Sequence, residues 1–286
     1  VYLTQLLLGI HPLVYYVAPA VASIIQTVFL YKTANLIRGR SFAFISTILY
    51  LSFPQTIRDM SHPRVSVFSI MFFLIAFYYA LKFFMDSRSA DVAEGPRRSD
   101  LIISGINIFF MYMSKEDSLY YLPAIMLMVY LSRKRLSDLI IFGILPFSMF
   151  ICETCAYHFF TEFKYGRLSV ITGKHFDTVT PLPSWLSLFD RFKGKYVRPY
   201  FRYPLFISMA GGIYLLIKKR YDDNNRLNPL VFVIISLFLY VFFMTFLVKS
   251  THPVVPLNTF RTRYMNIIIP PMILIITYMA YGLCAV

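Results

Sequence analysis

Long apolar stretches alternate with short polar segments along the whole chain. About 20 apolar residues are needed for a helix to cross the hydrocarbon core of a bilayer. Several stretches approach or exceed this length, whereas four others reach only about 12 or 13 residues. The pattern predicts an all-α fold, a polytopic transmembrane helical bundle of about nine spans. The predicted spans are residues 13–31, 42–53, 65–85, 101–113, 119–131, 139–157, 205–217, 230–248 and 265–286.

One polar and aromatic segment, residues 158–203, is much longer than the other connections. A loop of this length is usually functional or disordered. This one contains the only Trp of the chain together with many aromatic and basic residues, a composition that argues against disorder. We expect it to form a lid over a site at the membrane surface. It divides the chain into N-terminal transmembrane helices (1–157), the lid (158–203) and C-terminal transmembrane helices (204–286).

The composition agrees with a protein embedded in the lipid bilayer. Hydrophobic residues make up 58% of the chain and charged residues only 15%, whereas a soluble domain is near a quarter charged. The chain begins with Val rather than Met, and no signal peptide is visible at its start. We therefore expect further N-terminal sequence, with one or more spans, to precede residue 1.

The basic residues allow the two faces of the bundle to be assigned. Connections that alternate along the chain fall on two faces with about equal numbers of Lys and Arg. Long loops follow the positive-inside rule less closely, so the face without the long segment is predicted to be cytoplasmic. We expect a plasma membrane of a prokaryote, with residues 158–203 extracytoplasmic. The outer face is then basic, which suits either a phosphate-bearing ligand or contact with anionic headgroups.

The four short spans predict a recess in the outer face. Twelve or thirteen helical residues extend about 20 Å, against a hydrocarbon core of about 30 Å. Basic or acidic residues mark the cytoplasmic ends of these spans, so the shortfall falls on the outer side. Polar backbone at that depth must be buried in protein or line a wet cavity. The alternative is that flanking Ser, Thr and Tyr residues extend each helix to full length.

Four basic residues on the predicted outer face are candidates for binding a phosphate group. Arg261 and Arg263 precede the last span, and Arg58 and Lys115 lie in outer turns. The guanidinium fork matches two phosphate oxygens, which makes Arg well suited to this role. The alternative is that these side chains anchor helix ends in the headgroup layer.

Three carboxylates on the same face are candidates for general acid–base chemistry. Glu116 and Asp117 are adjacent in the turn SKEDS, and Asp59 lies in the preceding outer turn. Such groups can act as a base or hold a divalent cation. They also suit a capped, solvated turn that has no chemical role.

Other standard sites are not indicated by the sequence. Cys152, Cys155 and His158 share one helical stripe, but a zinc site needs a fourth ligand or an open water position, so we expect helix packing and no metal. There is no GxxxxGK[ST], GxSxG or HExxH motif, and no sequence context for binding nucleic acid. No cofactor is predicted apart from the divalent cation left open above.

Five segments of the chain, taken in order, carry a family resemblance. They are IHPLVYY (10–16), LYLSFPQTIRDMSHPRVSVFSIMFFLIAFYYALKF (49–83), MSKEDSLYYLPAIMLMVYL (113–131), FKYGRL (163–168) and FRTRYMNIIIPPMILI (260–275). In the order of these segments the chain resembles the GT-C superfamily of membrane glycosyltransferases, the relatives of protein O-mannosyltransferases and of the aminoarabinose transferase. The similarity covers most of the chain.

The resemblance implies a hexosyl- or pentosyltransferase. Such an enzyme moves a sugar from a polyprenyl-phosphate donor to a glycan, lipid or protein acceptor on the extracytoplasmic face. In the family, a catalytic Asp or Asp-Glu pair lies in an outer loop before the region matching 10–16, so the catalytic residue itself stays unassigned. Residues placed over the acceptor or the lipid are Tyr165, Arg167, Trp185 and Tyr264. A transporter or flippase for a lipid-linked anion is the alternative, and a non-enzymatic membrane subunit follows it.

Overall fold

The computed structural model describes residues 14–60, 65–88, 96–160, 197–219, 221, 227–246, 248–251, 254–256 and 265–284. Its α-helices are α2 (Val14–Arg38), α3 (Arg40–Ser52), α4 (Pro54–Met60), α5 (Val65–Asp86), α6 (Arg98–Ser114), α7 (Leu122–Arg133), α8 (Leu136–Phe160), α11 (Pro199–Lys218), α12 (Leu230–Phe246) and α13 (Ile269–Cys284). Two short 3-10 helices are η1 (Glu116–Tyr121) and η3 (Asn266–Ile268). Strands β1 (Val248–Thr251) and β2 (Val254–Pro256) pair antiparallel, with Thr251 opposite Val254.

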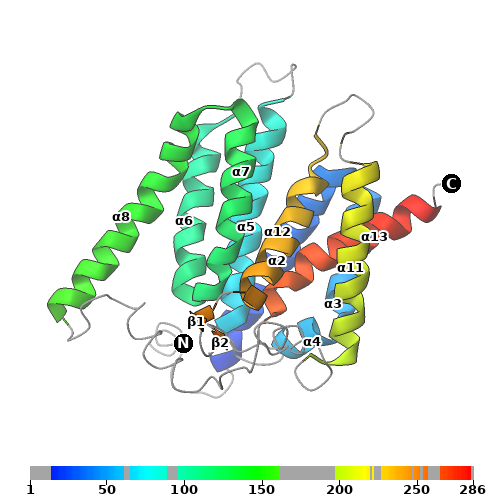
Figure 1. The fold of residues 1–286 in the computed structure, drawn as a ribbon, viewed down its shortest axis with the longest axis horizontal. Coiled ribbons are helices and arrows are strands. Elements are labelled where there is room, and N and C mark those ends of the chain that lie inside the picture. The colour runs from blue at the N-terminus through cyan, green and yellow to red at the C-terminus, as the bar shows by residue number, and fades with distance from the viewer. Residues whose placement is uncertain are drawn as a thin grey trace.

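The described residues form a helical bundle, which confirms the predicted all-α membrane fold (Figure 1). Every predicted span overlaps a helix of the structure. The end of α5, the start of α6, the α7–α8 turn, the end of α11 and the start of α12 lie at one end of the bundle, which we call the far end (Figure 1). Helix α4, the start of α11 and the β1–β2 hairpin lie at the opposite end, which we call the α4 end. The helix ends thus fall into two groups, as the predicted alternation of the connections requires, and the side of the membrane that each group faces stays a prediction.

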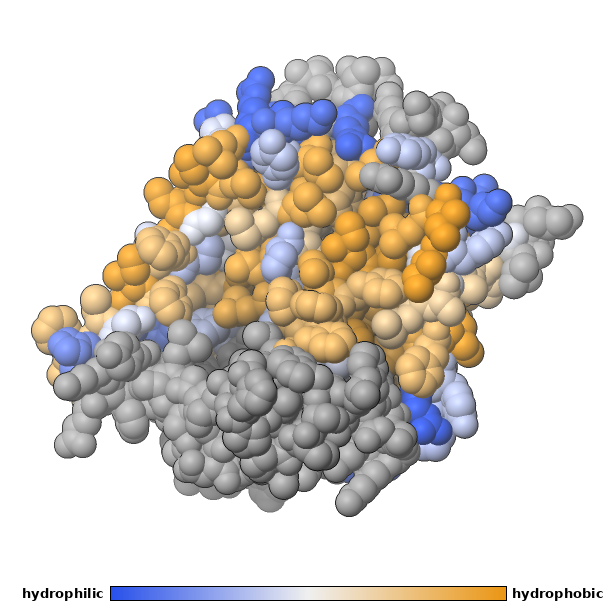
Figure 2. Space-filling view, viewed as in Figure 1, coloured by the Kyte–Doolittle hydropathy of each residue, from blue (hydrophilic) through white to orange (hydrophobic). Residues whose placement is uncertain are grey.

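The surface matches a bundle embedded in a membrane. Apolar side chains form a broad band across the helices, and strongly hydrophilic side chains gather at the far end (Figure 2). Among the described residues, four helices are long and apolar enough to cross a bilayer; these are α2, α5, α8 and α11. Helices α12 and α13 are shorter and apolar.

The structure corrects three details of the prediction. The polar segment after Phe53 contains helix α4, and the segment after α12 contains the β1–β2 hairpin, although the sequence predicts irregular connections in both places. Helices α6 and α11 are 17 and 20 residues long, because the polar residues next to each apolar stretch are also helical. These two helices are therefore not short, and they give no support to the predicted recess. Helices α3 and α7 are short, at 13 and 12 residues.

Backbone chemistry explains the two sharp breaks near the start of the bundle. Gly39 separates α2 from α3 with a φ of 87°, a conformation that costs a side-chain-bearing residue energy and glycine almost none. Phe53 separates α3 from α4 in an extended conformation, as expected for a residue that precedes proline. Pro54 then begins α4 at the position where its missing N–H is not needed.

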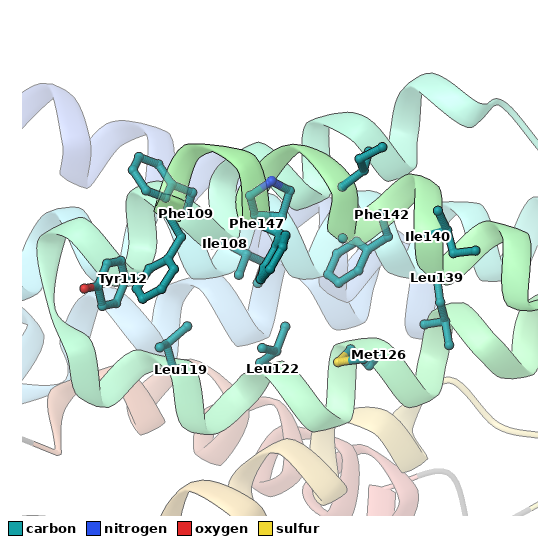
Figure 3. Close-up of a pocket in the computed structure, with 14 residues that line it drawn as sticks. Ile108, Phe109, Tyr112, Leu119, Leu122, Met126, Leu139, Ile140, Phe142 and Phe147 are labelled. Atoms are coloured by element: carbon teal, nitrogen blue, oxygen red, sulfur yellow. The ribbon is translucent and has the colours of Figure 1, made fainter. Parts of the chain in front are cut away.

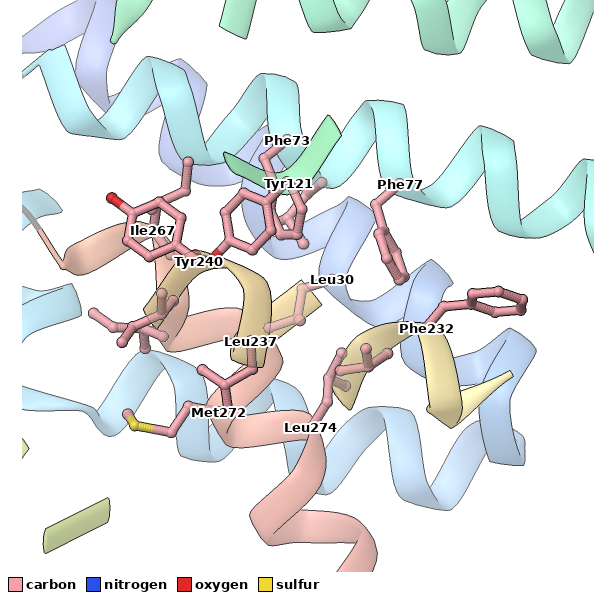
Figure 4. Packing of buried hydrophobic residues seen from close by; sticks show 14 of the residues in the cluster. Leu30, Phe73, Phe77, Tyr121, Phe232, Leu237, Tyr240, Ile267, Met272 and Leu274 are labelled. Atoms are coloured by element: carbon pink, nitrogen blue, oxygen red, sulfur yellow. Dashed lines mark hydrogen bonds between the residues drawn. The ribbon is translucent and has the colours of Figure 1, made fainter. Parts of the chain in front are cut away.

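Aromatic packing joins the helices at the centre of the core (Figure 4). The ring of Tyr121 stacks on Phe73 and on Tyr240, with centroid distances of 4.1 and 4.9 Å, and so links η1 to α5 and α12. Offset stacking of this kind adds about 0.5–1.5 kcal/mol per pair beyond the area that is buried.

Helix α8 stands at the edge of the bundle. Only 6% of its most apolar window is buried, compared with 67% for α5 (Figure 1). It packs closely on α6 at Gly105, where an added Cβ atom would lie 2.3 Å from the carbonyl oxygen of Phe142. The missing side chain at Gly105 therefore allows α8 to pack this closely against α6.

Candidate functional site

Helix α4 turns its polar face toward the protein. Gln55, Thr56 and Asp59 are buried, whereas Ile57 and Arg58 are exposed. An amphipathic surface helix normally shows the reverse arrangement. Buried polar groups need hydrogen-bond partners, so the inward face of α4 marks a polar site inside the α4 end of the bundle.

The Asp59 carboxylate lies at the centre of this site and is only 3% exposed. One of its oxygens accepts a hydrogen bond from the Gln55 amide nitrogen at 3.1 Å. The other accepts a hydrogen bond from the Asn266 amide, which belongs to η3 and lies 207 positions away in the chain. Two amides from distant parts of the sequence thus fix both oxygens of one carboxylate.

A second group of polar side chains lies around this carboxylate. The Tyr200 hydroxyl of α11 donates to the Gln55 amide oxygen at 3.0 Å. The Tyr50 hydroxyl donates to the amide oxygen of Gln26 at 2.7 Å, and both residues line a small cavity that Asp59 also lines. The site therefore combines groups from α2, α3, α4, α11 and η3.

Two buried oxygens beside Asp59 have no hydrogen-bond partner within the described parts of the chain. They are the Thr56 hydroxyl and the side-chain carbonyl of Asn266. Thr56 lines the same small cavity as Asp59. An unsatisfied buried polar atom costs about 1–3 kcal/mol. A polar group that enters the site and donates hydrogen bonds to these two oxygens removes that cost.

The turn that joins α6 to α7 forms the second part of the site. Lys115 ends α6 in an extended conformation, and its ammonium group lies 3.4 Å from the Asp117 carboxylate. The side chains of this ion pair are 13% and 9% exposed. The turn is connected to η3, because the Tyr121 hydroxyl donates to the Ile267 carbonyl at 2.9 Å. Asn266, which donates to Asp59, and Ile267, which accepts from Tyr121, are thus neighbours in η3.

An apolar pocket of about 510 Å³ lies between α6, α8 and the η1–α7 segment (Figure 3). Phe109 and Tyr112 of α6 line it together with Leu119, and these residues flank the Lys115 turn in the sequence. The pocket is lined by Ile108, Phe109, Tyr112, Leu119, Leu122, Met126, Leu139, Ile140, Phe142, Gly143, Ile144, Pro146, Phe147 and Phe150. Its lining is suited to a hydrocarbon group.

Of the predicted site residues, Lys115 and Asp117 form an ion pair, whereas the carboxylate of Asp59 contacts Gln55 and Asn266. Arg58 lies on the exposed face of α4, whereas Asp59 faces inward. Glu116 belongs to η1, but its side chain lies outside the described part. The other predicted residues lie outside the described residues; they are Arg261, Arg263, Tyr264, Tyr165, Arg167 and Trp185, with most of the predicted lid.

The sequence analysis missed Gln55, Tyr200 and Asn266, which surround Asp59. Gln55 precedes Asp59 by four residues, and side chains at this spacing are neighbours only on a helix. The sequence analysis did not predict a helix at α4. Asn266 is a polar residue that begins an apolar run, so it resembles an ordinary helix start. Nothing in the sequence indicates that these residues meet.

No group of three or more His, Cys, Asp and Glu side chains in the described ranges could hold a metal ion. Cys152 and Cys155 are both exposed on α8. The Asp59 carboxylate instead accepts hydrogen bonds from two amides.

Comparison with known proteins gives one match. A model of the dolichyl-phosphate-mannose-protein mannosyltransferase family matches residues 2–158, which is more than half of the chain and contains α2 through most of α8. No curated protein and no solved structure matches significantly. The matched region includes Asp59, Lys115, Asp117 and every residue that lines the apolar pocket. The chain therefore belongs to the dolichyl-phosphate-mannose-protein mannosyltransferase family and is a membrane glycosyltransferase of the GT-C type.

Proposed function

We propose that this glycosyltransferase takes a sugar from a polyprenyl-phosphate donor and transfers it to a glycan, lipid or protein hydroxyl at the α4 end of the bundle, on the extracytoplasmic side. The family implies a lipid-linked sugar donor and an acceptor in a membrane. The alternative of a transporter or flippase gains no support from the comparisons.

The observation that carries the proposal is the apolar pocket beside the Lys115–Asp117 turn. A polyprenyl phosphate combines a long hydrocarbon chain with an anionic head. The pocket offers an apolar surface for the chain, and Lys115, which lies in the sequence between the lining residues Tyr112 and Leu119, offers a positive charge. Charge-assisted hydrogen bonds to phosphate are about twice as strong as neutral ones. The two halves of the donor thus match two adjoining parts of the structure.

The carboxylate that acts as the base stays unassigned, because in the family it lies in an outer loop before the region matching 10–16. Asp117 pairs with Lys115, and Asp59 is only 3% exposed, with an amide on each of its oxygens. In the proposed step, the acceptor oxygen attacks the anomeric carbon and its proton passes to a carboxylate that acts as the base. The bond between that carbon and the phosphate oxygen breaks, and the phosphate leaves with the electron pair. Lys115 stabilises the charge of the leaving phosphate, as we also propose for Arg261 and Arg263.

The experiment measures transfer of radiolabelled sugar from defined polyprenyl-phosphate hexoses and pentoses into the protein-bound and lipid-bound fractions of membranes that contain the protein. Lys115→Gln is expected to reduce transfer about tenfold at low donor concentration, because the phosphate loses a charged partner. Lys219→Gln at the far end is the matched control and is expected to leave transfer unchanged. Activity of Lys115→Gln at low donor concentration close to that of the unsubstituted protein would contradict the proposed donor site, and the preferred labelled donor identifies the sugar class.

A further inference from the structure

We infer that Arg38 and Arg40 bind the phosphate group of an anionic phospholipid at the far end of the bundle, where α2 and α3 meet α13. The inference does not depend on the proposed function, which concerns the α4 end. Helix α3 leads into α4, so its start at Arg40 lies toward the far end, as does the end of α2 at Arg38 (Figure 1). Only Gly39 separates the two arginines, so their Cα atoms lie within about 7 Å of each other.

Two tyrosine rings hold the Arg38 guanidinium in place. It lies over Tyr278 and Tyr281 of α13, at 4.5 and 4.7 Å from the two ring centroids. These tyrosines are three positions apart and therefore share one face of the helix. The buried Phe42 ring packs edge-on against both, and the Asn228 amide donates to the Tyr278 hydroxyl at 3.2 Å. Contacts from α3 and from the segment that precedes α12 thus fix the rings on which the cation lies.

The protein does not use the hydrogen-bond donors of Arg38. Within the described residues, its side chain forms no hydrogen bond and no ion pair. Arg88 and Arg133, which also lie over aromatic rings at the far end, donate to the carbonyl oxygens of Leu227 and Pro96. A guanidinium carries five N–H donors in a planar fork that fits two phosphate oxygens. A guanidinium that is held over rings and lacks a protein acceptor is therefore suited to an anionic ligand.

Arg40 adds a second positive charge that no carboxylate offsets. Its side chain is exposed, and it forms no ion pair in the described parts of the chain. The first turn of α3, which begins at this residue, contains no acidic residue. Basic residues that gather at the ends of transmembrane helices attract anionic lipids. Two arginines at one helix junction therefore match the charge of an anionic headgroup.

The outer face of α3 favours a lipid over a soluble anion. Arg40, Phe44 and Ile48 recur at a spacing of four residues and are all exposed, so they form one stripe along the helix. Ile45, next to this stripe, is exposed as well. The stripe is basic at the far end and apolar along the rest of its length. A phospholipid has the same order of groups, because its phosphate lies in the headgroup layer and its acyl chains lie in the hydrocarbon core.

The test measures lipid binding by the full purified protein in detergent micelles. Dioleoylphosphatidylglycerol is the anionic probe, and dioleoylphosphatidylcholine at the same mole fraction is the neutral reference. Native mass spectrometry counts the lipids that stay bound, and thermal unfolding measures the stabilisation that each lipid gives. The unsubstituted protein is expected to bind phosphatidylglycerol at least about fivefold more tightly than phosphatidylcholine.

Four variants locate the site. Arg38→Gln is expected to weaken phosphatidylglycerol binding about tenfold, because a charged bidentate contact is lost. Arg38→Lys keeps the charge but loses the fork, and Arg40→Gln removes a charge at an exposed position; each is expected to weaken binding about threefold. Arg135→Gln is the matched control: it removes an exposed basic residue in the α7–α8 turn, which lies at the far end but away from α13 (Figure 1). Its expected effect is below about twofold, because salt screens distant charges.

The other outcomes would overturn the inference. If Arg38 only supports the fold, Arg38→Gln lowers the unfolding temperature equally with either lipid and leaves the preference for phosphatidylglycerol intact. Equal losses in Arg38→Gln and Arg135→Gln would show attraction by overall charge without a site. Inorganic phosphate is added in a further series. If it displaces phosphatidylglycerol and stabilises the protein to the same extent, the arginines bind a soluble anion and the lipid assignment fails.

Discussion

The Tyr121 hydroxyl donates a hydrogen bond to the Ile267 carbonyl at 2.9 Å, across 146 positions of the chain. In a helix, this carbonyl would accept from the backbone N–H three or four residues later. Those positions are Pro270 and Pro271, which have no N–H. The tyrosine therefore supplies the donor that the two prolines lack, and in doing so it joins the Lys115 turn to the helix start that holds Asp59.

Tyr121→Phe is therefore expected to lower the free energy of unfolding by about 1–3 kcal/mol, because the buried Ile267 carbonyl loses its side-chain donor. The measurement is thermal or denaturant unfolding of the purified protein in detergent. Tyr130→Phe on α7, whose side chain is exposed, serves as the control and is expected to change stability by less than about 0.5 kcal/mol. Equal stability of the two variants would contradict the role given to Tyr121.

Lys115→Gln is expected to raise the KM for the polyprenyl-phosphate donor about tenfold, because the phosphate loses a charged partner. Steady-state kinetics with a labelled donor in mixed micelles measure this change. Lys219→Gln, an exposed lysine at the far end, is the control. Since the substitution also leaves Asp117 without this cation, Lys115→Gln is compared with Lys115→Gln combined with Asp117→Asn. If the second substitution restores donor affinity, the loss came from the unpaired carboxylate and not from the missing phosphate contact.

Gly143→Phe is expected to fill the apolar pocket. A Cβ atom added at Gly143 meets no atom within 4 Å, and the residue lines the pocket, so a ring has space to enter. The fold is expected to tolerate the change, because Phe has a higher helix propensity than Gly. The KM is expected to rise for donors with long polyprenyl chains and to change little for a donor with one or two isoprene units. An equal effect on short and long donors would place the hydrocarbon chain elsewhere.

Gly105→Ala is expected to destabilise the packing of α8 on α6 by about 1–3 kcal/mol, because the new methyl group would clash with the Phe142 carbonyl. Unfolding of the purified protein in detergent measures the effect. Gly282→Ala on α13 is the control, since an added Cβ atom there meets nothing within 4 Å. A stability for Gly105→Ala equal to that of the control would show that α8 moves away from α6 at no cost.

The helices could be predicted from the sequence because a bilayer imposes a length and an apolar composition on each span. Helix α4 could not, because its polar face is buried and its apolar Ile57 is exposed, which is the reverse of the usual pattern. Asp59 and Lys115 were found as candidates because charged residues are rare beside apolar spans. Asn266, which donates to Asp59, and Tyr200, which donates to Gln55, lie far away in the sequence, and nothing in their spacing indicates these contacts.

The apolar pocket could not be predicted either. In the sequence, the pocket residues look like ordinary lipid-facing or core residues. They form a pocket only because of the way α8 packs against α6 near Gly105 and Pro146. This geometry depends on where one backbone can approach another. The composition of the spans does not encode it.

Helix α8 also determines how a lipid substrate would arrive. Ile140, Ile144 and Phe147 line the pocket and are each more than half exposed on the outside of the bundle. On the proposed function, the donor enters sideways by diffusion within the bilayer and never passes through water. The relevant concentration is then its mole fraction among the surrounding lipids, so diluting the membrane with inert phospholipid slows transfer even when the total amounts of enzyme and donor stay the same.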